Sequence, residues 1–283
     1  MRFLTARLSA KRRSPLAGVV VLLLGLLMTG GLYAALSPAQ ADTETADQAT
    51  LSKGKALFLV GCASCHGKNA EGVVAAEGHG QYGPPLIGVG AASVDFQMGT
   101  GRMPMSQPGP QAAAKPPLYN SQEIAAVAAY IASLGPGPAI PSPDEYDTSD
   151  ATNEEIVRGG QFFLTNCTAC HNFAASGGAL PQGKYAPTLE GVSNKHIYEA
   201  LITGPQQMPV FSDAVLKPQE KREIIAYLNS IEEMPKYGGV TNLGKFGPVS
   251  EGFFAWVVGI GSLVGFAIWI ASHSVRAKKG VKA

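Results

Sequence analysis

The sequence predicts a mainly α-helical protein, in which two tandem domains of one design lie between an N-terminal and a C-terminal transmembrane helix. Three observations support this fold class. Two uncharged apolar runs, residues 16–36 and 253–272, stand near the two ends of the chain. Between them, a pattern of glycine, cysteine, histidine and methionine occurs twice with equal spacing. Each of these halves closes with apolar residues at helical periodicity.

Each apolar run is long enough to cross the hydrocarbon core of a bilayer as a helix. The flanks, residues 1–15 and 273–283, contain basic residues and no acidic ones: Arg2, Arg7, Lys11, Arg12, Arg13, Arg276, Lys278, Lys279 and Lys282. The positive-inside rule therefore places both termini in the cytoplasm and the two domains outside the cell membrane. A cleaved signal peptide ending at Ala39-Gln40-Ala41 is the alternative for the first run, but 21 residues exceed the usual signal-peptide core.

One pentapeptide occurs twice and uses all four cysteines: Cys62-Ala-Ser-Cys65-His66 and Cys167-Thr-Ala-Cys170-His171. It is the attachment signature of a c-type haem, because two thiols on one turn can form thioethers with the vinyl groups while the histidine points at the iron. The sequence therefore predicts two covalently bound haem c groups. A structural zinc site is less favoured, since each cluster offers three ligands where a closed site needs four.

A Met-Pro pair follows each motif histidine by 37 residues, at Met103 and at Met208. A methionine thioether is the common sixth iron ligand of cytochromes c, so the predicted axial pairs are His66 with Met103 and His171 with Met208. Met98 and Met105 remain rivals in the first half and Met234 in the second, and the equal spacing favours Met103 and Met208. Irons closed in this way have no open position, which predicts one-electron relay and no catalytic residue in the chain.

Three other residues near this pattern invite interpretation. Arg102 precedes the first predicted methionine ligand and is a candidate partner for a haem propionate, a role that the sequence leaves undecided. His79 and His196 are predicted to be surface or structural residues. If His79 replaced Met103 on the iron, the spectrum would lose its methionine–iron charge-transfer band.

The repeat extends beyond the ligands. Gly54 and Gly159 stand eight residues before the first cysteine of each motif, and Phe58 and Phe163 stand four before it. Residues 83–88 match residues 186–191. The expected closing helices, residues 121–134 and 217–230, place apolar residues on one face: Ile124, Val127, Ala128 and Ile131 in the first, and Ile224, Tyr227 and Leu228 in the second. Ser121 is the expected N-cap of the first, and Pro218 stands early in the second, where proline is tolerated.

Each half resembles a class I cytochrome c domain, over residues 50–135 and 153–234. The expected linker, residues 136–152, is proline-rich and acidic, and residues 235–252 connect the second domain to the last helix. A domain of about 80 residues has a marginal core, so we expect the haem to supply much of its apolar interior and a haem-free chain not to fold stably. The first half has a longer loop, residues 106–117, expected to be a surface excursion, with a docking element as the alternative.

The net charge of +1 conceals an uneven distribution. Residues 42–252 contain 13 basic and 21 acidic residues, so the predicted outer part has a net charge of −8. This acidity argues against nucleic-acid binding. It could steer the domains toward a basic partner surface or serve solubility, and the sequence does not decide between these.

The tandem domains with an anchor at each end resemble the dihaem cytochrome cc subunit of the actinobacterial cytochrome bcc complex, a menaquinol–cytochrome c reductase. The resemblance covers the whole chain. It implies the electron-transfer subunit of a redox-driven translocase, with cytochrome b and a Rieske iron–sulfur protein as companion subunits. It also implies that electrons pass from the Rieske protein through the two haems to the copper centre of a terminal cytochrome c oxidase within a supercomplex.

Two other functions remain open from the sequence. A membrane-anchored dihaem carrier could serve another dehydrogenase or reductase. A dihaem peroxidase would need one open or histidine-ligated iron, whereas this chain offers a methionine in both halves.

Overall fold

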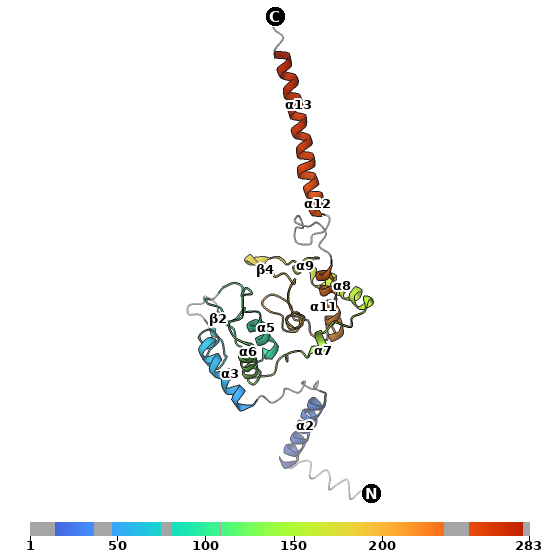
Figure 1. Ribbon diagram of the computed structural model, residues 1–283. Coiled ribbons are helices and arrows are strands. Elements are labelled where there is room, and N and C mark those ends of the chain that lie inside the picture. The colour runs from blue at the N-terminus through green and yellow to red at the C-terminus, as the bar shows by residue number, and fades with distance from the viewer. Residues whose placement is uncertain (1–14, 37–46, 75–80, 108, 235–248, 280–283) are drawn as a thin grey trace. The chain divides into compact units, whose positions relative to one another are not determined.

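The computed structural model describes residues 15–36, 47–74, 81–107, 109–234 and 249–279. The chain divides into two units, residues 1–45 and 46–283. The described part of the first unit is one helix, α2 (Pro15–Leu36), which agrees with the predicted apolar run. The second unit contains two helical domains and a C-terminal helix (Figure 1). His79, the Ala39–Ala41 segment and most of the N-terminal basic flank lie outside the described residues.

The first domain begins with a helix, turns through the first cysteine motif, and closes with a second long helix. Its elements are α3 (Gln48–Gly61), α4 (Ala63–His66), β1 (Val73–Val74), β2 (Gln81–Gly83), α5 (Gly90–Gly99) and α6 (Ser121–Ala132). β1 and β2 form a short antiparallel hairpin, and α6 packs against both α3 and α5. The core between these helices contains Phe58, Val94, Ile124, Val127 and Ile131.

The second domain repeats this order. Its elements are α8 (Asn153–Asn166), α9 (Thr168–His171), β3 (Gly178–Leu180), a 3-10 turn (Pro181–Gly183), β4 (Lys184–Ala186), α10 (Asn194–Thr203) and α11 (Pro218–Glu233). β3 pairs antiparallel with β4, and α11 packs against α8 (Figure 1). The predicted apolar face is buried, since Ile224 is 1 % and Leu228 is 5 % exposed. The predicted repeat is therefore a repeat of structure.

A glycine lets the first and last helices of each domain cross at backbone contact. A Cβ added at Gly54 would stand 2.0 Å from the Ala126 carbonyl oxygen, and one at Gly159 would stand 1.9 Å from the Glu223 carbonyl oxygen. Only a residue without a side chain permits this approach. The same crossing also seats an aromatic pair in each domain: Phe58 with Tyr130 and Phe163 with Tyr227 have ring centroids 5.5 and 5.6 Å apart.

The expected N-cap of α6 was wrong by one residue. Asn120 caps this helix by accepting a hydrogen bond from the Glu123 amide, and the Glu123 carboxylate accepts one from the Asn120 amide in return. This reciprocal capping box satisfies two amides that Ser121 would leave unpaired. Pro218 occupies the first turn of α11, as expected.

The proline-rich linker is fixed to both domains. The Pro138 carbonyl accepts a hydrogen bond from the Ala92 amide at the start of α5. Further along lies the one-turn helix α7 (Pro143–Tyr146), whose Glu145 carboxylate accepts a hydrogen bond of 3.0 Å from the Tyr198 hydroxyl on α10. Arg222 of α11 pairs with Asp150. The acidic stretch of the linker is therefore partly neutralised by the second domain.

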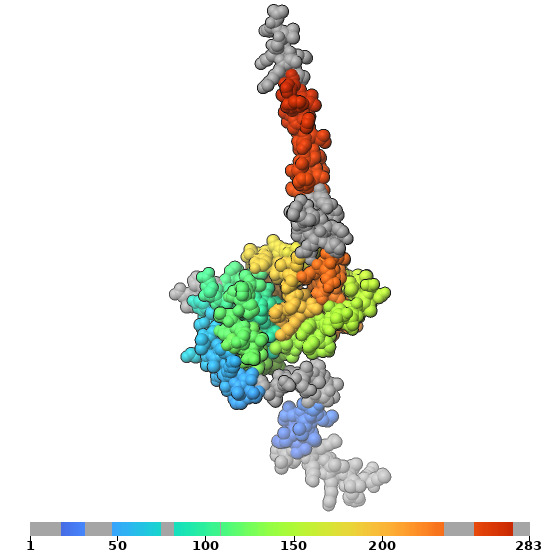
Figure 2. All heavy atoms as spheres, in the orientation of Figure 1, coloured from blue at the N-terminus to red at the C-terminus, as the bar shows by residue number. Residues whose placement is uncertain are grey.

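The two domains contact each other through α5 and α10, helices that occupy the same place in the two repeats. In the space-filling view, the green atoms of the first domain lie against the yellow atoms of the second (Figure 2). The longer loop of the first domain adds to this contact, and the expectation of a surface excursion was wrong. The side chain of Gln111 makes two hydrogen bonds to the Tyr185 backbone, of 2.6 and 3.0 Å. Gln206 donates to the Ala112 carbonyl at 3.0 Å. The loop thus docks on the second domain.

A cluster of ionisable residues lies between α5 and α10. Lys195 Nζ is 2.5 Å from Asp95 Oδ2 and 3.8 Å from Glu199 Oε1. Glu199 is fully buried, and neither of its oxygens has a hydrogen-bond partner among the described residues. Burial, and next the negative charge of Asp95, raise the pKa of Glu199 to about 9. Glu199 therefore holds a proton at neutral pH.

This raised pKa makes the second domain less stable as the pH increases. The ordinary pKa of a glutamate is 4.5, whereas that of Glu199 in the folded domain is about 9. The stabilising effect of the neutral carboxyl is therefore complete below about pH 4.5 and is lost as the pH rises to about 9. In that window the free energy of unfolding should fall by up to about 1.4 kcal/mol per pH unit. Glu199→Gln, which cannot ionise, should remove this slope in denaturant titrations between pH 5 and 9. The exposed Glu154→Gln should retain it, and equal slopes in both variants would contradict the assignment.

The C-terminal helix runs through α12 (Val249–Phe254), a π-helical turn (Ala255–Ile260) and α13 (Gly261–Lys279). Residues 252–273 are long and apolar enough to cross a membrane, and large apolar side chains such as Trp256 and Leu263, each 71 % exposed, lie along them. This is the single candidate span among the described residues. The described apolar part of α2, residues 18–31, is shorter, so an N-terminal membrane helix stays a prediction.

Candidate haem sites

Each cysteine motif forms one tight turn at the end of a long helix. In the first domain the amides of Cys65 and His66 both donate to the Cys62 carbonyl, at 3.1 and 2.9 Å. In the second domain the amides of Cys170 and His171 donate to the Cys167 carbonyl at the same two distances. The predicted pairs of thiols and their histidine are therefore brought together on a single turn in each domain.

A backbone carbonyl orients each motif histidine. Nδ1 of His66 lies 2.8 Å from the Pro84 carbonyl oxygen, and Nδ1 of His171 lies 3.0 Å from that of Pro187. A carbonyl only accepts, so Nδ1 carries the proton and Nε2 keeps its lone pair for a metal. Burial lowers the pKa of His171, although the hydrogen bond to Pro187 opposes this, and the neutral form suits a metal ligand. The matched segments 83–88 and 186–191 contain both prolines, and this sequence match was the available signal for their role.

The four thiols form no disulfide with one another. Burial is the main cause that raises the pKa of Cys62 and of Cys167 to about 11, with the second cysteine of each motif contributing. Cys170, by contrast, is exposed. In each motif, two unpaired thiols beside an imidazole with a free Nε2 are a donor set that fits covalent haem attachment.

The two predicted methionine ligands occupy equivalent places. Met103 packs against the same core cluster as Cys62, and Met208 packs against the cluster that contains Cys167. Met98 is 4 % exposed on α5 within the first cluster, and Met234 is 58 % exposed at the end of α11. Exposure argues against Met234 as a ligand of a buried iron. The choice of Met103 over Met98 and Met105 continues to depend on the equal spacing.

His196 has a structural place between the domains. Its ring meets the edge of Phe96 with centroids 6.2 Å apart, and Gly99 leaves room for it, because a Cβ there would stand 2.9 Å from His196 Nε2. Burial is the main cause that lowers the pKa of His196. The ring therefore packs as a neutral aromatic group.

Comparison with known proteins agrees with this arrangement. Residues 51–135 match the family model of cytochrome c, and residues 154–228 match that of subunit III of the cbb3-type cytochrome c oxidase. The chain is 43 % identical over 277 residues to the cytochrome bc1 complex cytochrome c subunit of Corynebacterium efficiens, covering 93 % of this chain and 91 % of that protein. The subunit of the same name from Mycobacterium tuberculosis is 41 % identical over 274 residues, covering 95 % of each.

The chain belongs to the family of cytochrome bc1 complex cytochrome c subunits. The resemblance read from the sequence is thereby confirmed. Its two cytochrome c domains indicate covalently bound haem c and the function of an electron carrier.

Proposed function

We propose that the chain is the dihaem cytochrome c subunit of a membrane menaquinol–cytochrome c reductase. Cys62 and Cys65 attach one haem and Cys167 and Cys170 the other. His66 with Met103 would hold the first iron, and His171 with Met208 would hold the second. The observation that carries this proposal is the pair of equivalent sites, each with two free thiols and a histidine whose Nδ1 is fixed by a proline carbonyl.

When bound, each haem supplies a one-electron ferric/ferrous couple. The residues of the chain set the conditions for that couple. The Pro84 and Pro187 carbonyls hold the imidazoles in the tautomer that ligates iron, and the methionine thioethers favour the ferrous state. Contact between α5 and α10 keeps the two domains adjacent, which supports direct transfer between them. No proton need move during the relay.

The partners follow from the family. The names of the relatives place those proteins in a cytochrome bc1 complex, and we extend this to cytochrome b and Rieske iron–sulfur subunits for this chain. Electrons would enter from the Rieske protein and leave toward a terminal cytochrome c oxidase. We also propose that both apolar helices span the cell membrane, with the haem domains outside and both termini in the cytoplasm.

Affinity purification of the tagged chain in mild detergent tests this proposal. Cytochrome b and a Rieske protein should co-purify, together with oxidase subunits, and the intact mass should include two haems. N-terminal sequencing of the same material should begin at or near Met1 if the first helix is retained. Recovery with a dehydrogenase in place of cytochrome b and the Rieske protein would support the alternative, a membrane-anchored dihaem carrier for another enzyme.

A further inference from the structure

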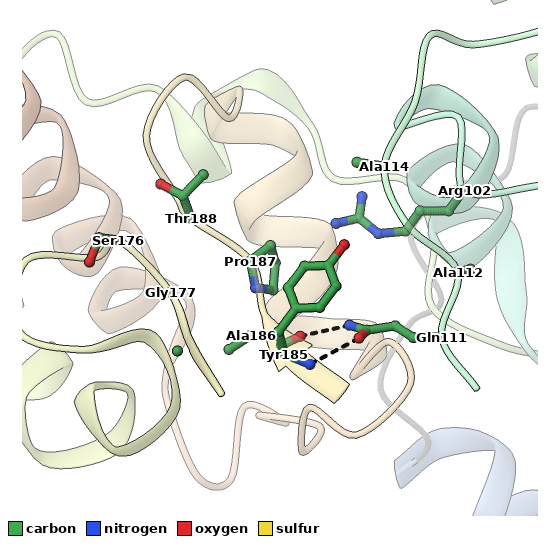
Figure 3. Close-up of a pocket in the computed structure, with 11 residues that line it drawn as sticks. Arg102, Gln111, Ala112, Ala114, Ser176, Gly177, Tyr185, Ala186, Pro187 and Thr188 are labelled. Carbon is green, nitrogen blue, oxygen red and sulfur yellow. Dashed lines mark hydrogen bonds between the residues drawn. The ribbon is translucent and has the colours of Figure 1, made fainter. Parts of the chain in front are cut away.

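A cavity of about 510 Å³ lies between the two cytochrome domains (Figure 3). The first domain forms one wall, with Arg102 and the loop residues Gln111, Ala112 and Ala114. The second domain forms the other wall, with residues 176–178 and 185–188. Arg102 is the single charged residue in the lining, and no acidic residue accompanies it.

Arg102 is oriented by an aromatic ring and has no counter-charge among the described residues. Its guanidinium carbon lies 4.9 Å from the centroid of the Phe96 ring, a cation–π contact that orients the side chain. None of the ion pairs among the described residues involves Arg102. Burial is the main cause that lowers its pKa, yet an arginine remains charged in proteins. A half-buried cation of this kind needs an anion to offset its desolvation.

The far wall of the cavity belongs to the second haem site. Pro187, which lines the cavity, is the residue whose carbonyl fixes His171. Gly178, also in the lining, lies against the attachment turn, since a Cβ there would stand 2.9 Å from the Cys170 carbonyl oxygen. The lining contains no residue of the first cysteine motif and none of the hairpin of the first domain. Arg102, which precedes Met103, is the cavity's link to the first site, and the opposite wall adjoins the attachment turn and the histidine of the second site.

We propose that Arg102 of the first domain is the counter-ion of a propionate of the haem attached to the second domain. The chemistry that recognises the propionate is a guanidinium paired with a carboxylate in a partly desolvated cavity. Figure 3 shows the guanidinium directed across the cavity toward Tyr185, away from its own backbone. This inference depends on the proposed haem attachment at Cys167 and Cys170. It assigns the first domain a part in setting the potential of the second haem.

A redox titration of the purified full-length protein, followed by its visible spectrum, tests the proposal. A cation beside a haem favours the ferrous state, so Arg102→Gln should lower the midpoint potential of the second haem. We expect the ferrous-to-ferric ratio at a fixed potential to fall about tenfold, which is about 59 mV for a one-electron couple. Arg102→Lys should restore most of the loss. Lys53→Gln removes an exposed cation from α3 of the same domain and should have little effect, because solvent screens it.

The Met208→His variant shows which of the two redox transitions belongs to the second haem. We expect this substitution to shift the midpoint potential of the second haem alone. Haem staining and intact mass are recorded first for every variant. A chain without the second haem would contradict both the proposed function and this inference. Two haems with an unchanged second potential, or with a shift confined to the first, would overturn the inference alone.

Discussion

Replacing Met208 with histidine is expected to lower the midpoint potential of the second haem by a substantial part of the roughly 0.8 V range that axial ligands span. A thioether is a soft ligand that stabilises ferrous iron, whereas a second imidazole favours the ferric state. The variant should also lose the methionine–iron charge-transfer band of one haem and keep that of the other. Both changes are read in a single spectroelectrochemical titration.

Matched methionine variants make this result specific. Met234→Leu should leave both potentials unchanged, because Met234 is largely exposed at the end of α11. In the first domain, Met103→His should shift the other transition, while Met98→Leu and Met105→Leu should not. A band that survives in Met208→His and disappears in Met234→Leu would reverse the ligand assignment.

Replacing Gly159 with alanine is expected to destabilise the second domain by at least about 3 kcal/mol, the upper end of the usual cost of overpacking. The new methyl group would stand 1.9 Å from the Glu223 carbonyl oxygen and 2.3 Å from its carbon. Both atoms are backbone, so α8 and α11 must separate to admit it. The free-energy cost of separating the helices exceeds the gain of about 1 kcal/mol that alanine brings to a helix interior.

Gly160 offers the control within the same helix. A Cβ at Gly160 would meet the Tyr227 ring at 3.0 Å, and a side chain can shift where a backbone cannot. Gly160→Ala should therefore change the free energy of unfolding by about 1 kcal/mol or less, since helix propensity and crowding oppose each other. Denaturant titrations of the two haem-loaded variants compare them directly. Equal stability of Gly159→Ala and the unaltered chain would refute the close crossing.

The features that repeat were the ones that the sequence could predict. Equal spacing located both attachment turns, and the apolar period of residues 121–134 and 217–230 located the closing helices. Gly54 and Gly159 were visible as a repeat, but their reason, a backbone crossing, depends on three-dimensional contact. The Asn120 cap was missed because Asn-Ser offers two adjacent capping residues, and only the box with Glu123 decides between them.

Contacts between the domains could not be predicted, because their residues do not repeat. Asp95, Lys195 and Glu199 have no counterparts of the same kind in the other half, and Gln111 lies in a loop that the second half lacks. In the sequence, Lys195, His196 and Glu199 on one helix suggest a solvent-exposed polar face. The structure shows that Glu199 is buried where α10 meets α5, a contact between domains that the sequence pattern does not reveal.

The interface between α5 and α10 joins two domains of one polypeptide, so it does not need a high intrinsic affinity. Each helix occupies the same place in its repeat, but the side chains that meet differ, as Asp95 with Lys195 shows. Two separate copies would need high intrinsic affinity to remain together, whereas a short tether supplies an effective concentration in the millimolar range. Because the linker joins the two domains covalently, weak and partly polar contacts suffice to hold them at a constant separation.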